Sequence, residues 1–258
     1  MSVQAARTSA SHDPVISVLS GLFGVFLGIA VALALSLFIV PFDQYLSICN
    51  YLQIITAFAG AAAFLTLYFR YGRGIGLLYA AGALALWGIA DIAWYVAVFF
   101  GAGLFTFPSL IDMGFVAAIL LLSSAYNRIY PRKQVPGIFL LAILVLVLIV
   151  PLAILATQGI TGQALMILLY FFACGSLIIT GLNHSLPDHP MALAGTLLFA
   201  LAFMIYPIRE TFFVGNPYLS IIGTFVAAGF SLIVLGFLPS SPSESPVEPA
   251  QAEPPRGP

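Results

Sequence analysis

Four charged residues lie at or inside long apolar stretches of this sequence: Asp91, Asp112, Arg209 and Glu210. A charged side chain in a membrane-spanning segment is costly, so such residues pair with one another, line a water-filled cavity or mark a ligand or ion pathway. The four residues could therefore form structural ion pairs, or a site that holds a small polar molecule, a cation or a proton. The residue types alone leave both interpretations open.

Aromatic side chains accompany Asp91 in its segment. Trp87, Trp94 and Tyr95 are each three or four residues from it, a spacing that places all four side chains on one face of a helix. Amphipathic rings gather at the membrane surface. This face could therefore belong to an outer aromatic belt, with Asp91 bonded to a neighbouring helix, or it could line a ligand or ion site.

The residues 108–112, Pro-Ser-Leu-Ile-Asp, have the form of a helix start. Ser109 would be the N-cap and Asp112 stands three residues later, which is the capping-box spacing with Asp in place of the usual Glu or Gln. A carboxylate there also meets the positive end of the helix dipole. We expect Asp112 to cap its helix, a role that leaves it able to contact a ligand at the mouth of a cavity.

Arg209 and Glu210 come late in their apolar segment. Neighbouring residues on a helix point about 100° apart, so we expect the two side chains to face different partners. Arg209 is expected to meet Asp91 or Asp112, and Glu210 to face water or take up a proton. Pro207 would loosen the helix nearby.

The composition identifies the solvent of these segments. Apolar residues make up 62% and charged residues 7% of the chain, with a mean hydropathy of +1.11. Soluble domains carry about 25% charged residues, so the lipid bilayer is the expected partner. A net charge of -1 offers no basic surface for nucleic acid. Cys49 and Cys174 are far apart in the sequence and are expected to be packing thiols, and we expect no metal or cofactor.

Eight apolar stretches, each about as long as the roughly 20 residues that span a bilayer, predict eight transmembrane helices. They cover residues 15–40, 47–69, 75–100, 109–127, 135–156, 161–183, 191–213 and 218–237. We therefore predict an all-α fold, a polytopic helical bundle, formed by one membrane domain at 15–238. An N-terminal tail at 1–14 precedes it, and a Pro- and Glu-rich tail at 239–258, expected to be disordered, follows it.

The basic residues predict the orientation of these helices. Seven of the eight Lys and Arg residues fall in tails and loops on one side: Arg7, Arg70, Arg73, Arg128, Arg132, Lys133 and Arg256. Positive charge concentrates in cytoplasmic loops, so we expect a multi-pass protein of the cell membrane with both termini in the cytoplasm. The four intramembrane charges then lie at one depth near the outer surface.

An unpaired charge in hydrocarbon costs several kcal/mol, so charges at one depth should converge. We expect one connected polar cluster that opens outward, walled by the two tryptophans and made of Asp91, Arg209 and either Asp112 or Glu210.

The two halves of the membrane domain resemble each other weakly. Matching stretches are residues 81–101 with 194–213, and 108–118 with 217–228. The halves, about 15–130 and 131–238, could be parallel 4+4 repeats related by an axis along the membrane normal, although apolar segments also match by chance. In this alignment Asp91 corresponds to Met204.

The pattern W-x3-D-x2-W at 87–94, followed by F-P-S-x2-D-x2-F at 107–115, resembles the membrane-embedded sensory regions at the N-termini of many prokaryotic histidine kinases and diguanylate cyclases. In this sequence no kinase, cyclase or PAS-like output region follows. The resemblance therefore implies a stand-alone sensor-like module or an accessory subunit.

We accordingly expect a sensor-like or accessory membrane protein with an outward-facing polar and aromatic pocket, whose partner is a small extracytoplasmic ligand or another membrane protein. The candidate ligand-binding residues are Trp87, Asp91, Trp94, Tyr95, Ser109, Asp112, Arg209 and Glu210. The alternative is a small transporter or channel for a cation, a proton or a small molecule. A membrane-embedded hydrolase ranks below both. A fainter likeness to eight-span lysoplasmalogenase-type hydrolases suggests it, but the second-half aspartate of those enzymes is replaced here by Met204, and we assign no catalytic residue.

Overall fold

The computed structural model describes residues 13–71, 74–101, 107–129, 136–183, 189–213 and 217–238. These residues form helices and no strand: α2 (Pro14–Ser36), α3 (Phe42–Tyr71), α4 (Gly76–Phe100), α5 (Leu110–Ile129), α6 (Gly137–Gln158), α7 (Gly162–Asn183), α8 (Pro190–Phe212), the short 3-10 helix η3 (Pro217–Ile221) and α9 (Ile222–Phe237).

Within these described ranges, eight helical segments, the last being η3 with α9, are long and apolar enough to cross a membrane. The prediction of an all-α bundle is therefore confirmed, and the chain is a multi-pass membrane protein. Most of the two predicted tails, and the basic residues Arg7, Arg73, Arg132, Lys133 and Arg256, lie outside the described residues.

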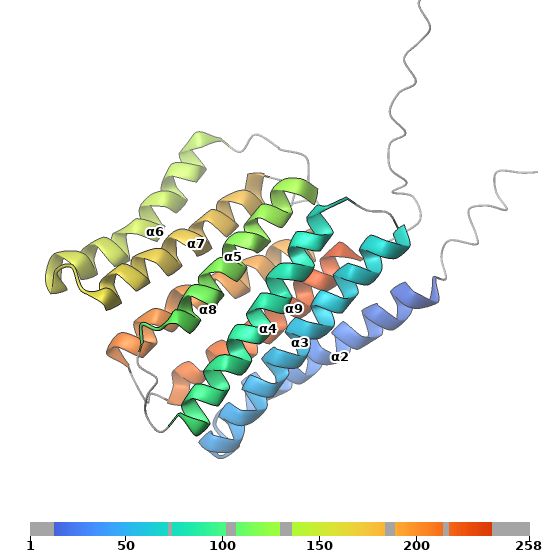
Figure 1. Ribbon diagram of the computed structural model, residues 1–258, viewed down its shortest axis with the longest axis horizontal. Helices are drawn as coiled ribbons and strands as arrows, with labels where there is room; N and C mark the ends of the chain where they lie inside the picture. The colour runs from blue at the N-terminus through green and yellow to red at the C-terminus, as the bar shows by residue number, and fades with distance from the viewer. Residues whose placement is uncertain are drawn as a thin grey trace, which may run out of the picture.

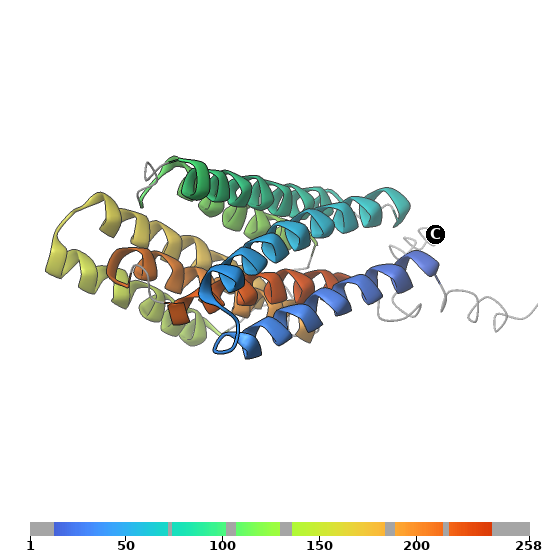
Figure 2. The same cartoon turned by 90° about the horizontal axis from the view of Figure 1, so that it is seen from below.

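The helices run side by side in a bundle (Figure 1), with α2 at one edge and α6 at the opposite edge. Helix α9 packs against α2, α3 and α8, and α5 packs against α4 and α7. Figure 2 shows the same bundle from below, with α2 and α6 again far apart.

The order of neighbouring helices is similar in the two halves of the bundle. The pairs α2·α3, α3·α4 and α4·α5 correspond to α6·α7, α7·α8 and α8·α9, and the contact of α3 with α9 corresponds to that of α7 with α5. A 4+4 repeat would produce this order, and the repeat itself stays a prediction.

A cluster of aromatic rings fills the middle of the bundle around Trp87, which is 1% exposed. Its ring centroid lies 4.6 Å from that of Phe115, 4.1 Å from Phe203, 5.0 Å from Phe199 and 5.6 Å from Phe230. These five side chains, here called the aromatic layer, join α4, α5, α8 and α9.

Small residues set the spacing of α8 and α9. A Cβ atom added to Gly195 would lie 2.6 Å from the carbonyl oxygen of Gly229 and 2.7 Å from the amide nitrogen of Ile233. The absence of side chains therefore lets the two backbones touch, as at many helix contacts in membranes.

The sequence predicts the same role for two other sets of small residues, residues 60–63 (Gly-Ala-Ala-Ala) and the glycines Gly21, Gly24 and Gly28 of α2, which would permit close approach of helices. Gly60 does lie at a close contact, where an added Cβ would meet Leu84 and Val234. The expectation for Gly21, Gly24 and Gly28 is wrong, because their face of α2 is exposed and an added Cβ would meet nothing within 4 Å. Helix α2 instead buries Phe23, Ala30 and Leu33.

Alanine substitutions of a glycine at the α8–α9 contact and of a glycine on the exposed face of α2 should have opposite effects on stability. We expect Gly195→Ala to lower the free energy of unfolding by about 1–3 kcal/mol, because the colliding atoms belong to the backbone and cannot rotate away. Gly24→Ala is the matched control and should leave the melting temperature in detergent unchanged or raise it, since alanine favours the helix. Equal melting temperatures for the two variants would contradict the packing of α8 on α9.

Candidate ligand-binding site

A pocket lies at the end of the bundle where α3 and α9 begin and where α4 and α8 end, called here the pocket end. It encloses about 480 Å³ of space without protein atoms, counting the part that is open to the surroundings. Arg70 and Arg128, at the ends of α3 and α5, lie at the opposite end of the bundle. The polar side chains that line the pocket are Asn50, Gln53, Asp91, Tyr206, Arg209 and Ser220.

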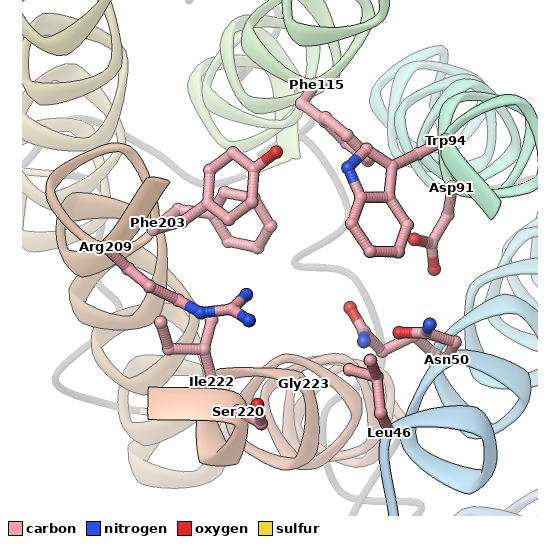
Figure 3. A pocket seen from close by; sticks show the side chains of 12 residues that line it. Leu46, Asn50, Asp91, Trp94, Phe115, Phe203, Arg209, Ser220, Ile222 and Gly223 are labelled. Atoms are coloured by element: carbon pink, nitrogen blue, oxygen red, sulfur yellow. The ribbon is translucent and has the colours of Figure 1, made fainter. Parts of the chain in front are cut away.

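Asp91 projects into the pocket from α4 (Figure 3). The residue is only 5% exposed, and within the described residues its Oδ2 atom has no hydrogen-bond partner. Burying a carboxylate without a partner carries a large free-energy cost. Such a group in a pocket marks a place where a bound molecule would supply the missing interaction.

Three other lining residues share this property. In the described part of the chain, no partner reaches Asn50 Nδ2, Arg209 Nε or Ser220 Oγ, all of which are buried. Buried polar groups in proteins are nearly always hydrogen-bonded to protein or to water. The four residues that carry these unsatisfied groups line one pocket, where a polar molecule could bind.

Arg209 enters the pocket from α8, across from Asp91 (Figure 3). Its Nη1 atom lies 3.0 Å from Oε1 of Glu210, and the two side chains are 14% and 17% exposed. The expectation that these neighbours face different partners is wrong. Their Cα–Cβ bonds diverge along the helix, but both side chains are long enough to bend back and meet.

The expected ion pair of Arg209 with an aspartate does not form among the described residues, where Arg209 pairs with Glu210. Asp91 and Arg209 do line one pocket, as the sequence predicts, but no hydrogen bond connects them. The space between them remains available to a ligand.

Asp112 is fully buried at the start of α5, where it accepts four hydrogen bonds. Oδ2 accepts from the backbone N–H of Ser109 at 2.7 Å and from its hydroxyl at 2.8 Å. Oδ1 accepts from the hydroxyls of Tyr170 at 3.1 Å and Tyr206 at 3.4 Å. The capping role is confirmed by the hydrogen bond that the backbone N–H of the N-cap residue, Ser109, donates to Asp112. With its acceptors occupied, Asp112 is a structural anchor, and neither it nor Ser109 lines the pocket.

The predicted aromatic face divides between three places. Trp94 lines the pocket beside Asp91, together with Phe115 and Phe203. Trp87 does not line it, and the expectation of a second tryptophan wall is therefore wrong: about two helical turns before Trp94, Trp87 packs behind Phe115 and Phe203 in the aromatic layer. Tyr95 pairs with Tyr51 of α3, and their hydroxyl oxygens lie 2.8 Å apart.

Sequence analysis missed four polar lining residues. Asn50 and Gln53 had a usable signal, because two amides three residues apart in an apolar helix must share a face. Ser220 and Tyr206 gave none, since a serine beside a predicted loop and a tyrosine in an apolar helix are common in any membrane bundle.

The fold and the pocket together define a class, a multi-pass α-helical membrane protein with a polar site near one end of the bundle. Comparison with protein-family models, with curated proteins and with solved structures finds no match for this chain.

Proposed function

We propose that the protein is a stand-alone sensor-like or accessory module of the cell membrane that binds a small molecule in this pocket. The observation that carries the proposal is the convergence of buried, unpartnered polar atoms from Asn50, Asp91, Arg209 and Ser220. Arg70 and Arg128 at the other end of the bundle, with the further basic residues that the sequence places in the same loops and tails, support an extracytoplasmic pocket with both termini in the cytoplasm.

Among the described residues, the charged and polar side chains that line a pocket lie at one end of the bundle, which favours binding over passage. Below the pocket the aromatic layer fills the space between α4, α5, α8 and α9. Beyond that layer the buried hydroxyls satisfy one another: Tyr126 bonds Thr196 at 2.8 Å, and Ser123 bonds Thr180 at 3.0 Å. A transporter needs polar groups that continue across the membrane, at least in one of its conformations.

A thermal-shift screen in detergent tests the proposal. Some small polar molecule should raise the melting temperature of the wild type, with a stabilisation of about 2.7 kcal/mol at 100 times its dissociation constant. The shift should disappear in Asp91→Asn. The control is Asp43→Asn, which removes the same charge from an exposed position in the first turn of α3, outside the pocket, and should keep the shift.

Two results would count against a binding module. If no molecule in the screen raises the melting temperature of the wild type by more than it raises that of Asp91→Asn, the support for a ligand is lost. Cation or proton flux in reconstituted liposomes that Asp91→Asn abolishes and Asp43→Asn preserves would establish the alternative, a small transporter or channel.

A further inference from the structure

We infer that the ligand of this pocket is an organic ammonium ion, a molecule with a positively charged amine and a hydrogen-bond acceptor oxygen a few bonds away from it. The inference rests on the proposed function, because it names the class of molecule that the same pocket would bind.

The charges around the pocket are balanced except for that of Asp91. Arg209 is already neutralised by Glu210 at 3.0 Å. Asp112 lies outside the pocket and accepts four hydrogen bonds of its own. Asp91 is the charged lining residue that the described structure leaves without a counter-ion. A ligand with one positive charge would neutralise the pocket, whereas an anion would add a second negative charge beside Asp91.

Aromatic rings from three helices, α4, α5 and α8, line the pocket. Trp94, Phe115 and Phe203 line the pocket with aromatic rings, and the faces of such rings attract cations that have lost their water. The same rings offer apolar surface to the hydrocarbon part of an amine. An organic cation uses both properties, whereas a neutral polar ligand could donate a hydrogen bond to Asp91 but would leave its charge without a counter-ion.

Arg209 faces Asp91 from the opposite wall of the pocket (Figure 3), and its Nε atom is a buried donor without a partner among the described residues. A ligand that reaches from Asp91 toward Arg209 should therefore carry an acceptor oxygen at some distance from its amine. Asn50 Nδ2, a second such donor, lies on the same side of the pocket as Asp91. These donors also make a bare metal cation a poor occupant, because a hard cation takes six to eight oxygen ligands. The described residues hold no group of three side chains suited to a metal ion.

An ammonium group with an apolar body can come from two sources, a soluble amine or the headgroup of an ethanolamine phospholipid. Both offer the same chemistry to Asp91, and both carry acceptor oxygens a few bonds from the nitrogen. The proposal is the ammonium group, and the experiment separates its sources.

The test compares molecules that share a skeleton and differ in charge. We would measure the melting temperature of the delipidated full chain in detergent with 3-phenoxypropylamine, 3-phenoxypropan-1-ol and 3-phenoxypropanoate, and in mixed micelles with phosphatidylethanolamine or phosphatidylglycerol. Titration calorimetry would give each dissociation constant. We expect the amine or the ethanolamine lipid to bind at least tenfold more tightly than its uncharged or anionic counterpart.

Variants connect this preference to Asp91. The tenfold selectivity should be lost in Asp91→Asn and kept in Asp43→Asn. If Asp91→Asn does not fold, the charge-preserving Asp91→Glu and the comparison of amine with alcohol on the wild type still decide the question. Selectivity for the soluble amine would identify a soluble ligand, and selectivity for the ethanolamine lipid a headgroup.

The outcomes separate this inference from the proposed function. Equal or tighter binding of the alcohol or the carboxylate, sensitive to Asp91→Asn, would overturn the ammonium assignment and leave a binding pocket. No binding by any member of the two series would overturn the ammonium assignment, and the wider screen described above would then decide whether the pocket binds anything.

Discussion

Asp112→Ala is expected to lower the free energy of unfolding by about 3–5 kcal/mol, because the change leaves several buried donors without an acceptor at once. The side chain is 0% exposed and accepts from the backbone and hydroxyl of Ser109 and from two tyrosine hydroxyls, Tyr170 and Tyr206. The hydroxyls of α7 and α8 lose the group that ties them to α5, and α5 loses its N-terminal cap. Thermal melting in detergent would measure the loss.

Three further variants separate the parts of this effect. Asp112→Asn keeps the volume of the side chain but leaves it only one oxygen. The free energy of unfolding should therefore fall by less than in Asp112→Ala and by more than the loss of a single hydrogen bond would cause. Tyr170→Phe removes a single donor together with its bond and should cost about 0.5–1.5 kcal/mol. Asp43→Ala, at an exposed position, should be close to neutral. If Asp112→Ala has the same melting temperature as Asp43→Ala, the anchoring role of Asp112 is wrong.

Arg209→Gln and Glu210→Gln should each lower stability by about 1–3 kcal/mol, because each leaves the other charge partly buried without its partner. The double variant should lose less than the sum of the two, by a coupling energy of about 0.5–3 kcal/mol, since neither charge is then orphaned. The cycle is measured from the melting of the wild type, both single variants and the double variant.

A second cycle, between Asp91 and Arg209, is the control. The two residues share a pocket without an ion pair, so their effects should add to within about 0.5 kcal/mol. Asp91→Asn alone should leave the protein as stable as the wild type or more stable, because it removes an unpartnered buried charge. Strong coupling between Asp91 and Arg209, or a large loss of stability in Asp91→Asn, would instead support the ion pair that the sequence suggests.

The sequence predicts the helices and the depth of the charged residues, but not which way each helix turns its faces. Eight spans follow from the length of the apolar stretches, and the capping by Asp112 follows from the local spacing of Ser109 and Asp112, because neither property needs knowledge of a neighbour. The choice of Glu210 as the partner of Arg209 depends on side-chain conformation. Spacing along a helix gives only the direction in which each side chain leaves the backbone.

The rotation of each helix about its axis explains the remaining errors. The glycines of α2 share a face, as their spacing requires, but that face points away from the bundle. Trp87 and Trp94 flank Asp91 in sequence, yet one is in the aromatic layer and the other beside the cavity. Which face is buried is decided by contacts between helices far apart in the chain, such as α3 with α9, and a single sequence does not contain them.

The separation of the two tryptophans also gives the protein a built-in optical probe. The chain has only two indole rings, so its tryptophan fluorescence originates at one site in the dry interior and one at the edge of the cavity. The fluorescence of Trp94 depends on whatever stands beside Asp91, while Trp87, enclosed by four phenylalanine rings, provides an internal reference that an occupant of the cavity does not touch. Occupancy of the cavity can thus be followed by intrinsic tryptophan fluorescence in the unlabelled protein, with Trp94→Phe as the control that lacks the reporting ring.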